Sequence, residues 1–224
     1  MGKVSKLKLA VLISGGGSNL QAIIDACNSA DYPAEIVLVF SNQTDAGGLE
    51  RGRKAGIRSE AISHKGYPGG REAYDEAVSA LIEESGADLV VLAGYLRLVS
   101  DSFVARWKDK LINIHPSLLP SFKGLGVHQA ALDAGVKFAG CTVHYVVPEV
   151  DSGPIIAQAV VPVLPGDDAG KLAQRILKQE HRIYPQVIRW IAEGRVSVDA
   201  KGIVTVAEAK PAEFAEINPA LEPG

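Results

Sequence analysis

The sequence contains few cysteines and no long apolar run, and each shortage excludes a class of protein. Among its 224 residues only Cys27 and Cys141 are cysteines, which is too few for a disulfide framework and favours a reducing compartment. No apolar run approaches the roughly 20 residues that cross a membrane. The first residues lack a signal-peptide core, and Lys6 stands where N-myristoylation requires Ser or Thr. We therefore expect a cytoplasmic protein with no membrane partner.

Charged residues and histidines also exclude function classes. The chain has 23 basic and 26 acidic residues, for a net charge of −3, and no run rich in Lys or Arg. We therefore expect no nucleic-acid partner. The five histidines show no paired spacing and the cysteines lie far apart, so no metal site is predicted. An apolar content of 47% with 22% charged residues is typical of a globular protein with a sizeable core.

Apolar segments and amphipathic segments alternate along the first half of the chain. Buried strands are predicted at residues 7–14, 34–40, 57–62, 89–93 and 110–114. Helices are predicted after Ser18, which we expect to be an N-cap, and at residues 46–55, 70–85 and 100–107. Strands that are apolar throughout and separated by helices indicate an α/β protein with a parallel sheet covered on both faces.

The second half of the chain has a different pattern. A short helix is predicted near residues 127–134, followed by two strands, 139–147 and 155–163, that are antiparallel about a turn at 151–154. A long helix at 168–192 and a small hairpin at 195–206 complete the pattern. The tail from Ala207 is rich in Ala, Glu and Pro and is expected to be poorly ordered. No repeat or linker divides the chain, so one domain is expected.

The run NIHPSLLP at residues 113–120 places an amide and an imidazole side by side at the end of a strand. Side chains two residues apart in a strand share a face, so Asn113 and His115 project together while the residue between them faces the core. Pro116 and Pro120 then force the chain into a loop. The pair is suited to stabilising an oxyanion and moving a proton. The alternative is a strand that ends in a proline turn, with Asn113 as its cap.

The run SGGGSNL at residues 14–20 lies between the first strand and the first helix. Glycines let the backbone approach a phosphate, and a helix N-terminus offers free N–H groups. Leu20 stands where a dinucleotide fingerprint and a nucleophile elbow need glycine, and the Gly-Lys-Ser/Thr end of a Walker loop is missing. The pattern favours a single phosphate monoester. The alternative is a tight turn that needs glycine for steric reasons.

Three charged residues stand apart from the usual surface pattern. Glu180 falls within the apolar stripe of the long helix, formed by Leu172, Ile176, Leu177, Ile183, Val187 and Ile191. A carboxylate on a buried face needs a partner, which is either an internal Arg or Lys or a polar substrate. Arg71 and Arg97 are isolated basic residues that either meet an anionic ligand or are solvated on the surface.

These motifs, in their order and spacing, resemble glycinamide ribonucleotide formyltransferase, the folate-dependent family of purine synthesis. The likeness covers about residues 7–192 and includes the runs SGGGSN at 14–19, SN at 41–42, LAGYLR at 92–97, NIHPSLLP at 113–120, DSGP at 151–154 and QEHRIYP at 179–185. It implies a Rossmann-like, mostly parallel sheet with an antiparallel C-terminal extension. The expected single domain is 1–206, with a phosphate-binding half at about 7–108, a catalytic half at about 109–193, the hairpin 195–206 and the tail 207–224.

The resemblance also implies roles for individual residues. The catalytic trio corresponds to Asn113, His115 and Asp151. The acceptor site corresponds to a phosphate loop and a residue that faces the glycinamide end, namely Gly17, Ser18, Asn19 and Glu180. The folate site corresponds to Arg71, Leu96, Arg97, Leu98 and Val99, and around the pterin to Asn113, Val147 and Asp151. On the strand at 139–147, Thr142 and His144 form a polar face that supports the trio.

The implied reaction needs two small-molecule substrates, 10-formyltetrahydrofolate and glycinamide ribonucleotide. The amine of the ribonucleotide attacks the formyl carbon, and Asn113 with protonated His115 stabilises the tetrahedral oxyanion. Asp151 holds His115 and favours its charged form. Neither a metal nor a covalent intermediate is required. The resemblance is also compatible with a homodimer.

Two related families share much of the His115 loop. Formyltetrahydrofolate deformylase carries an N-terminal regulatory domain, whereas here a strand is predicted almost at once, and methionyl-tRNA formyltransferase adds a C-terminal RNA-binding domain, whereas here a short acidic tail follows the last helix. Both lack this type of phosphate loop. The deformylase, which uses water as acceptor, and a catalytically silent folate or nucleotide binder are therefore the alternatives. An intact trio of Asn113, His115 and Asp151 argues against the silent binder.

Overall fold

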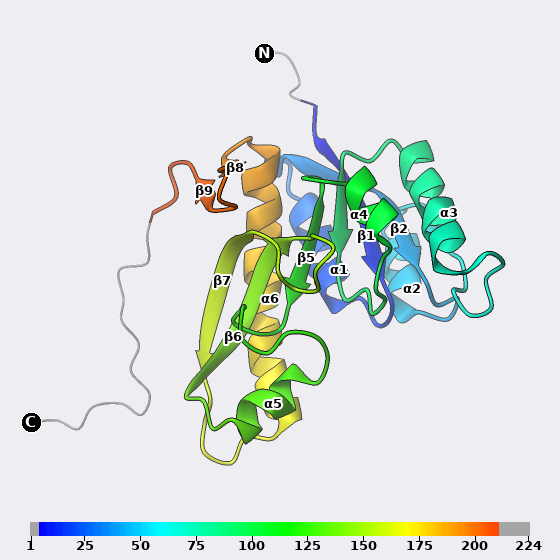
Figure 1. Cartoon of the computed structure of the whole chain (residues 1–224). Helices are drawn as coiled ribbons and strands as arrows, with labels where there is room; N and C mark the ends of the chain where they lie inside the picture. Colours follow the sequence, from blue (N-terminus) through cyan, green and yellow to red (C-terminus); the bar gives the residue numbers. More distant parts are fainter. Residues whose placement is uncertain (1–4, 211–224) are drawn as a thin grey trace, which may run out of the picture.

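The structure, a computed structural model, describes residues 5–210 and is organised around a seven-stranded sheet (Figure 1). The strand order is β3-β2-β1-β4-β5-β6-β7. Five strands are parallel, β1 (Leu7–Ile13), β2 (Ala34–Ser41), β3 (Ser59–Ala61), β4 (Leu89–Leu92) and β5 (Leu111–His115). The last two are antiparallel to their neighbours, β6 (Phe138–Tyr145) and β7 (Ile155–Pro162). The predicted α/β class and the antiparallel extension are confirmed.

Helices cover both faces of the sheet, as the apolar strands require. One face carries α1 (Ser18–Cys27), α2 (Gly47–Lys54) and the long α6 (Ala169–Ala192). The other carries α3 (Gly70–Glu84) and α4 (Asp101–Arg106). The short α5 (Val127–Asp133) packs with α6 beside β6 and β7. Among residues 5–210, no helix combines the length and the apolar character needed to cross a bilayer.

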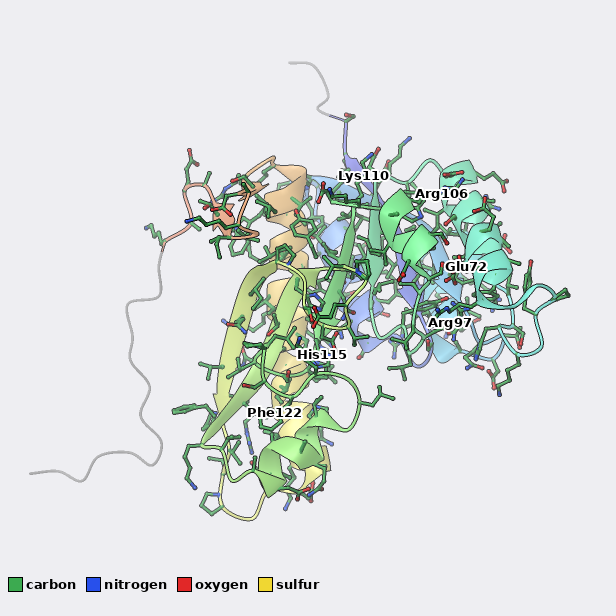
Figure 2. All side chains as sticks on the ribbon, in the orientation of Figure 1. Glu72, Arg97, Arg106, Lys110, His115 and Phe122 are labelled. Atoms are coloured by element: carbon green, nitrogen blue, oxygen red, sulfur yellow. The ribbon has the colours of Figure 1, made fainter. Side chains whose placement is uncertain are left out.

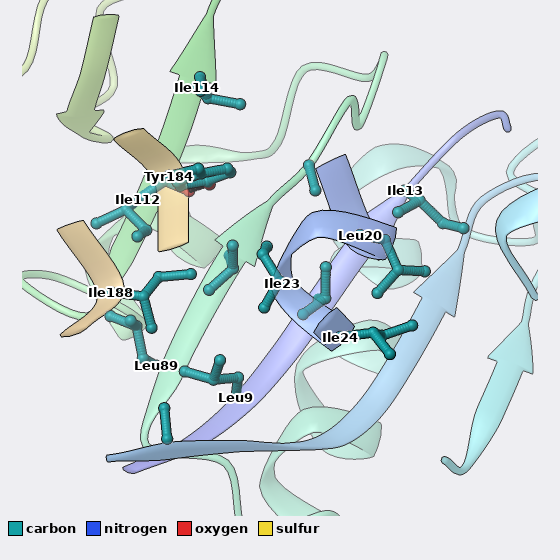
Figure 3. Close-up of a cluster of buried hydrophobic side chains, with 14 of the residues drawn as sticks. Leu9, Ile13, Leu20, Ile23, Ile24, Leu89, Ile112, Ile114, Tyr184 and Ile188 are labelled. Atoms are coloured by element: carbon teal, nitrogen blue, oxygen red, sulfur yellow. Dashed lines mark hydrogen bonds between the residues drawn. The ribbon is translucent and has the colours of Figure 1, made fainter. Parts of the chain in front are cut away.

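Strand β1 shows how the sequence forms two cores at once. Alternate side chains of a strand point to opposite faces, so Leu9 and Ile13 join the cluster under α1 and α6 while Leu12 joins the cluster under α3 and α4. Figure 3 shows the first cluster, with Leu9 and Ile13 facing apolar residues of α1 and with Ile188 of α6 nearby. The side chains that are named here are fully buried, namely Leu9, Leu12, Ile13 and Ile188.

The buried face of α6 differs in detail from the predicted stripe. The residues buried on it are Leu172, Ile176, Glu180, Tyr184, Pro185, Val187 and Ile188. Leu177, Ile183 and Ile191 are only partly buried. Tyr184 was not predicted as a core residue, yet its hydroxyl donates to the Leu92 carbonyl oxygen at 2.9 Å. That hydrogen bond satisfies the one polar atom of the ring and lets a tyrosine occupy the core.

Two local predictions were wrong. The third strand is confined to Ser59–Ala61, shorter than the predicted 57–62. The N-cap of α1 is Gly17 rather than Ser18, because Gly17 takes the left-handed conformation (φ 70°) and Ser18 is already helical. Glycine adopts that conformation without a Cβ penalty, and no side chain caps the helix.

The chain after α6 forms the predicted hairpin. Strands β8 (Val196–Val198) and β9 (Val204–Val206) pair antiparallel. The predicted poorly ordered tail begins at Ala207, and residues 207–210 are exposed. Residues 211–224 lie outside the described part of the chain, and the prediction for them remains a prediction.

The strand order determines where a ligand can bind. Strand β1 lies between β2 and β4, so the chain winds outward from β1 in both directions. In open parallel sheets, ligands bind beyond the carboxyl ends of the strands where the winding direction changes. That edge receives the glycine-rich loop after β1, the residues after β4, and Asn113 and His115 at the end of β5.

Candidate active site

The predicted trio meets at the carboxyl end of β5, where Figure 2 labels His115. The carboxylate of Asp151, from the turn between β6 and β7, lies 3.4 Å from Nδ1 of His115. The other imidazole nitrogen of His115, Nε2, lies 2.9 Å from the carbonyl oxygen of Phe122. Nδ1 of His115 thus faces a carboxylate and Nε2 faces a carbonyl oxygen, and both of these groups are acceptors. The His115 side chain is 7% exposed and that of Asp151 is 10% exposed, so water screens this pair weakly.

Asn113 is oriented by His144 on the neighbouring strand. The two residues are directly opposite in the β5–β6 pairing, and Asn113 Nδ2 lies 3.2 Å from His144 Nε2. His144 Nδ1 lies 2.8 Å from the carbonyl oxygen of Tyr145, which can only accept, so Nδ1 carries the proton and Nε2 accepts from the amide. Burial lowers the pKa of His144, which agrees with this neutral tautomer.

The loop after β5 closes over the trio. Its Gly124 N–H donates to the Asp151 carboxylate at 2.8 Å, and Lys123 Nζ donates to Ser152 Oγ at 2.5 Å. Phe122, whose carbonyl oxygen accepts from His115, has a left-handed backbone (φ 55°). Sequence reasoning missed these contacts, because no local pattern shows which turn a loop will meet.

Thr142 supports the trio by holding the start of this loop. Its hydroxyl donates to the Ser117 carbonyl oxygen at 2.7 Å and accepts from the Leu119 N–H at 3.1 Å. Gln158 of β7 donates to the same hydroxyl at 3.0 Å and to the Leu119 carbonyl oxygen at 2.9 Å. Gln158 was not predicted. Its polar side chain on an otherwise apolar strand, opposite Thr142, was the available signal.

The glycine-rich loop is packed against α2. A Cβ on Gly17 would lie 2.8 Å from the Cα of Gly48, so Gly17 cannot be replaced without moving the backbone. Arg51 of α2 donates from Nε to the Gly16 carbonyl oxygen at 2.7 Å. Within the described residues, the N–H groups of Gly17 and Ser18 donate to no protein acceptor. The loop therefore offers free N–H groups and a nearby positive charge, as an anion site requires.

The side chain of Asn19 faces inward, away from the loop surface. Its Nδ2 donates to Oε2 of Glu180 at 2.6 Å, and both residues are 7% exposed. This corrects the structural alternative for Glu180, because its partner is an amide and not an internal Arg or Lys. Burial raises the pKa of Glu180, whereas the Asn19 hydrogen bond and the charge of His115 lower it.

A surface pocket of about 450 Å³ lies along α1, between α2 and α6. Its lining includes Ser18 at the N-terminus of α1, Arg51 of α2 and His181 of α6. Sequence reasoning missed Arg51 and His181, because only the packing of three helices brings them to the glycine-rich loop.

The chain after β4 also lies beside the glycine-rich loop. The Leu96 N–H donates to Ser14 Oγ at 2.8 Å, and that hydroxyl donates to Asn42 Oδ1 at 2.6 Å. Leu96 and Leu98 are exposed by 73% and 60%. Exposed leucines of this kind provide apolar surface for a flat ligand.

Arg97 does not have a solvated side chain, contrary to one of the two expectations for it. Its guanidinium pairs with the buried Asp75 and lies 4.3 Å from the ring centroid of Tyr74. Asp75 also accepts from the Ser100 N–H at 2.6 Å. Arg97 therefore holds the segment at residues 96–100 in place. Arg71 is exposed at the start of α3, where no ion pair is formed with another described residue.

Two other expectations concern ligands. In the part of the chain that the structure describes, no group of three or more His, Cys, Asp or Glu side chains is arranged to hold a metal ion. Val147 is half-buried at the start of the loop that leads to Asp151. The arrangement at this edge of the sheet thus combines an amide, an imidazole and a carboxylate with an anion site, which suits acyl transfer to a substrate that carries a phosphate ester.

Residues 7–188 match the family model described as formyl transferase. The chain belongs to the formyl transferase family. The phosphoribosylglycinamide formyltransferase of Escherichia coli (strain K12) is 47% identical over 192 residues, which are 86% of this chain and 90% of that protein. The trifunctional purine biosynthetic protein adenosine-3 of Bos taurus is 47% identical over 197 residues, or 88% of this chain, but the match spans only 19% of its length.

Solved formyl transferase structures show the same fold. The glycinamide ribonucleotide transformylase 1 of Symbiobacterium toebii has a TM-score of 0.87 and 48% identity, covering 90% of this chain and 94% of that one. A formyltetrahydrofolate deformylase from Pseudomonas syringae has a TM-score of 0.83 but 29% identity, covering 90% of this chain and 66% of that one. The formyl transferase fold is therefore shared by both activities, and identity favours the transformylases.

Proposed function

We propose that this formyl transferase moves the formyl group of 10-formyltetrahydrofolate to the amine of 5′-phosphoribosylglycinamide, a step of de novo purine biosynthesis. The observation that carries the proposal is the meeting of Asn113, His115 and Asp151 beside the glycine-rich loop at one edge of the sheet. The similarity to phosphoribosylglycinamide formyltransferases over nearly their whole length supports it.

The reaction proceeds by direct attack. The amine nitrogen bonds to the formyl carbon, and the carbonyl electrons move to oxygen to form a tetrahedral oxyanion. The Asn113 amide, oriented by His144, and the His115 imidazolium donate to that oxygen. Because Nδ1 of His115 faces Asp151, Nε2 is the nitrogen that can donate to the substrate, whose oxyanion would replace the Phe122 carbonyl oxygen that lies 2.9 Å from it. Collapse expels the folate nitrogen, which takes up the proton that the amine loses, with water as carrier.

Asp151 lies beside His115, where its carboxylate can pair with an imidazolium. A carboxylate close to an imidazole favours the imidazolium by direct attraction, and the two side chains are 3.4 Å apart and nearly buried. The Gly124 N–H holds the carboxylate oxygen in this position. An imidazolium stabilises an oxyanion better than a neutral imidazole does, because its charge adds to its hydrogen bond.

The acceptor substrate lies along the N-terminus of α1. The phosphate accepts hydrogen bonds from the free N–H groups of Gly17 and Ser18, and the N–H of Asn19 follows next in the helix. Arg51 supplies positive charge next to the loop. Glu180 faces the glycinamide end. The acceptor site adjoins the catalytic residues, since the glycine-rich loop and the end of β5 lie at the same edge of the sheet.

The folate donor lies on the other side of the trio. Its contacts are the residues after β4, the exposed Arg71 and the loop before Asp151, which together comprise Arg71, Leu96, Arg97, Leu98, Val99, Asn113, Val147 and Asp151. The guanidinium of Arg97 is occupied by Asp75, so Arg97 contributes through its backbone. The apolar surface of Leu96 and Leu98 contacts the flat pterin.

An assay of tetrahydrofolate release separates this proposal from the alternatives. Release that requires the ribonucleotide is expected. Release that is equally fast without the ribonucleotide would indicate a deformylase that uses water, and binding without release would indicate a silent folate or nucleotide binder. A single domain at residues 1–206, a cytoplasmic location and a homodimer remain predictions.

A further inference from the structure

Ser14 follows β1 directly and begins the glycine-rich loop, and it connects this loop to the chain after β4. Its backbone N–H donates to the Gly94 carbonyl oxygen at 3.0 Å, and its hydroxyl oxygen accepts from the Leu96 N–H at 2.8 Å. In the described part of the chain, no hydrogen bond joins residues 15–19 directly to residues 95–100. The two loops are therefore held to each other through Ser14.

The Ser14 hydroxyl both accepts and donates, and its partners determine the direction of each hydrogen bond. A backbone N–H can only donate, so Oγ accepts from Leu96, and the hydroxyl proton is left for Oδ1 of Asn42 at 2.6 Å. The other end of that amide, Nδ2 of Asn42, lies 3.2 Å from Nδ1 of His64. A side chain that lacks either the donor or the acceptor at position 14 would break this chain of hydrogen bonds.

The chain of hydrogen bonds crosses the carboxyl edge of the sheet. Its three members, Leu96, Ser14 and Asn42, follow β4, β1 and β2, which are neighbours in the sheet. Asn42 is only 1% exposed, and His64 Nδ1 also lies 3.1 Å from its backbone carbonyl oxygen. The buried amide is therefore a fixed point, and the hydroxyl ties the exposed Leu96 to it.

Formyl transfer makes the distance between these two loops important. The phosphate of the acceptor is assigned above to Gly17 and Ser18, and the folate donor to the segment at residues 96–99. Reacting atoms must approach to about 3–3.5 Å, and a displacement of about 1 Å can slow a reaction about 10²-fold. A bond that fixes one loop relative to the other therefore acts on the rate of the reaction.

We propose that Ser14 is a positioning residue for formyl transfer, whose hydroxyl holds the donor segment at the distance from the glycine-rich loop that the reaction needs. The inference rests on the proposed function, because it assigns one substrate to each loop. Ser14 acts through the Leu96 N–H and contacts neither the amine nor the formyl group. Its loss should therefore lower kcat while each substrate still binds to its own loop.

The first experiment is Ser14→Ala, which removes the hydroxyl and keeps the backbone hydrogen bond to Gly94. kcat is expected to fall about tenfold or more, because the substrates meet out of register. The affinities for the ribonucleotide and for tetrahydrofolate, each measured alone by calorimetry, should stay within about twofold of the wild type. Ser14→Thr keeps a hydroxyl and should retain most of kcat. Unchanged kcat in folded Ser14→Ala, or Ser14→Thr as slow as Ser14→Ala, would overturn the inference.

Ser41→Ala is the matched control for stability. Ser41 is a buried serine at the same edge of the sheet, and its hydroxyl also accepts from a backbone N–H, that of Gln43 at 3.0 Å. That hydrogen bond stays within the turn after β2 and reaches neither loop. Denaturant unfolding should show similar losses of stability for Ser41→Ala and Ser14→Ala, because each leaves one backbone N–H without its partner. kcat should fall in Ser14→Ala alone, and equal falls in both would show that turnover follows stability.

Amide hydrogen exchange tests the same bond in the wild-type protein, even if Ser14→Ala fails to fold. Leu96 is 73% exposed, yet its N–H is hydrogen-bonded to Ser14, so its exchange rate reports on this bond. Ribonucleotide bound at the glycine-rich loop should slow that exchange about tenfold, because it restrains Ser14. An exchange rate that bound ribonucleotide leaves unchanged would contradict the inference. Tetrahydrofolate release that needs no ribonucleotide would instead refute the proposed transferase and, with it, this role of Ser14.

Discussion

His144 Nε2 lies 3.2 Å from the amide nitrogen of Asn113, and its other ring nitrogen lies 2.8 Å from a backbone carbonyl oxygen. The second contact determines the tautomer, and the tautomer determines which end of the Asn113 amide faces His144. The Asn113 amide, which we propose binds the oxyanion, is therefore held in place by a neutral histidine on the adjacent strand. Alternation along β6 indicated that His144 lies on a polar face, but not which residue it contacts.

The first prediction concerns this contact. In His144→Phe, the amide of Asn113 loses its acceptor and can rotate, so kcat should fall about tenfold or more, with both KM values nearly unchanged. Because burial lowers the pKa of His144, the residue is already neutral at neutral pH. The pH–rate profile of the folded variant should therefore keep its shape. A lost limb in that profile would show that His144 itself titrates during catalysis.

The second prediction concerns Asp151. Asp151→Asn removes the charge beside His115 but keeps the shape of the side chain. We expect kcat to fall on the order of 10²-fold or more, with the affinity for the ribonucleotide little changed. The limb of the pH–rate profile that belongs to His115 should shift or disappear. Near-normal kcat at neutral pH in a folded variant would show that Asp151 is only a turn residue.

The third prediction concerns the glycine-rich loop. Gly17→Val places a side chain against Gly48, in a left-handed conformation that valine tolerates poorly. Binding of the ribonucleotide should weaken while folate binding stays nearly intact, as measured by calorimetry. Gly15→Ala is the control, because a Cβ at Gly15 meets no atom within 4 Å. Unchanged ribonucleotide affinity in folded Gly17→Val would contradict the phosphate site.

The fourth prediction concerns Glu180. Its partner in the structure is the neutral amide of Asn19, so Glu180→Gln leaves no unpaired buried cation. The KM for the ribonucleotide should rise, and the free energy of unfolding should stay within about 1 kcal/mol of the wild type. Steady-state kinetics measures the KM, and denaturant unfolding measures the free energy of unfolding. A large loss of stability with unaltered kinetics would favour a structural role.

The fifth prediction compares two arginines. Arg97→Met leaves the buried carboxylate of Asp75 without its cation, which should destabilise the fold by about 3–5 kcal/mol. Arg71→Met removes an exposed charge and should change stability by no more than about 0.5 kcal/mol. Denaturant unfolding measures both. Equal stabilities for the two variants would show that the Arg97–Asp75 pair contributes little.

The local sequence pattern was sufficient to predict most of the strands and helices. The apolar strands, the helix periods and the turn at Asp151 predicted every strand of the sheet, including the antiparallel pair. The N-cap prediction failed because of backbone conformation. Ser18 has the composition of an N-cap, but Gly17 adopts the left-handed conformation that starts the helix one residue earlier. Local composition does not reveal which of two adjacent residues takes that conformation.

The candidate site was only partly predictable. Asn113 and His115 could be paired from the sequence, because the two-residue period of a strand places them on one face. Arg97 could not be assigned, because it lies in a loop and its partner Asp75 lies on helix α3. The partner of Glu180 was also inaccessible, since Asn19 is 161 residues away along the chain. Contacts over such separations depend on how helices pack and not on local pattern.

By itself, the sequence determined the order of strands and helices, the glycine-rich loop and the chemical types available at the carboxyl edge of the sheet. These follow from side-chain size, hydrophobic period and backbone freedom, which act over a few residues. Only the tertiary structure decided the pairings. It placed Asp151 against His115, His144 against Asn113 and Asn19 against Glu180. Hydrogen bonds and charges act over a few ångströms, so their partners exist only once distant segments have packed together.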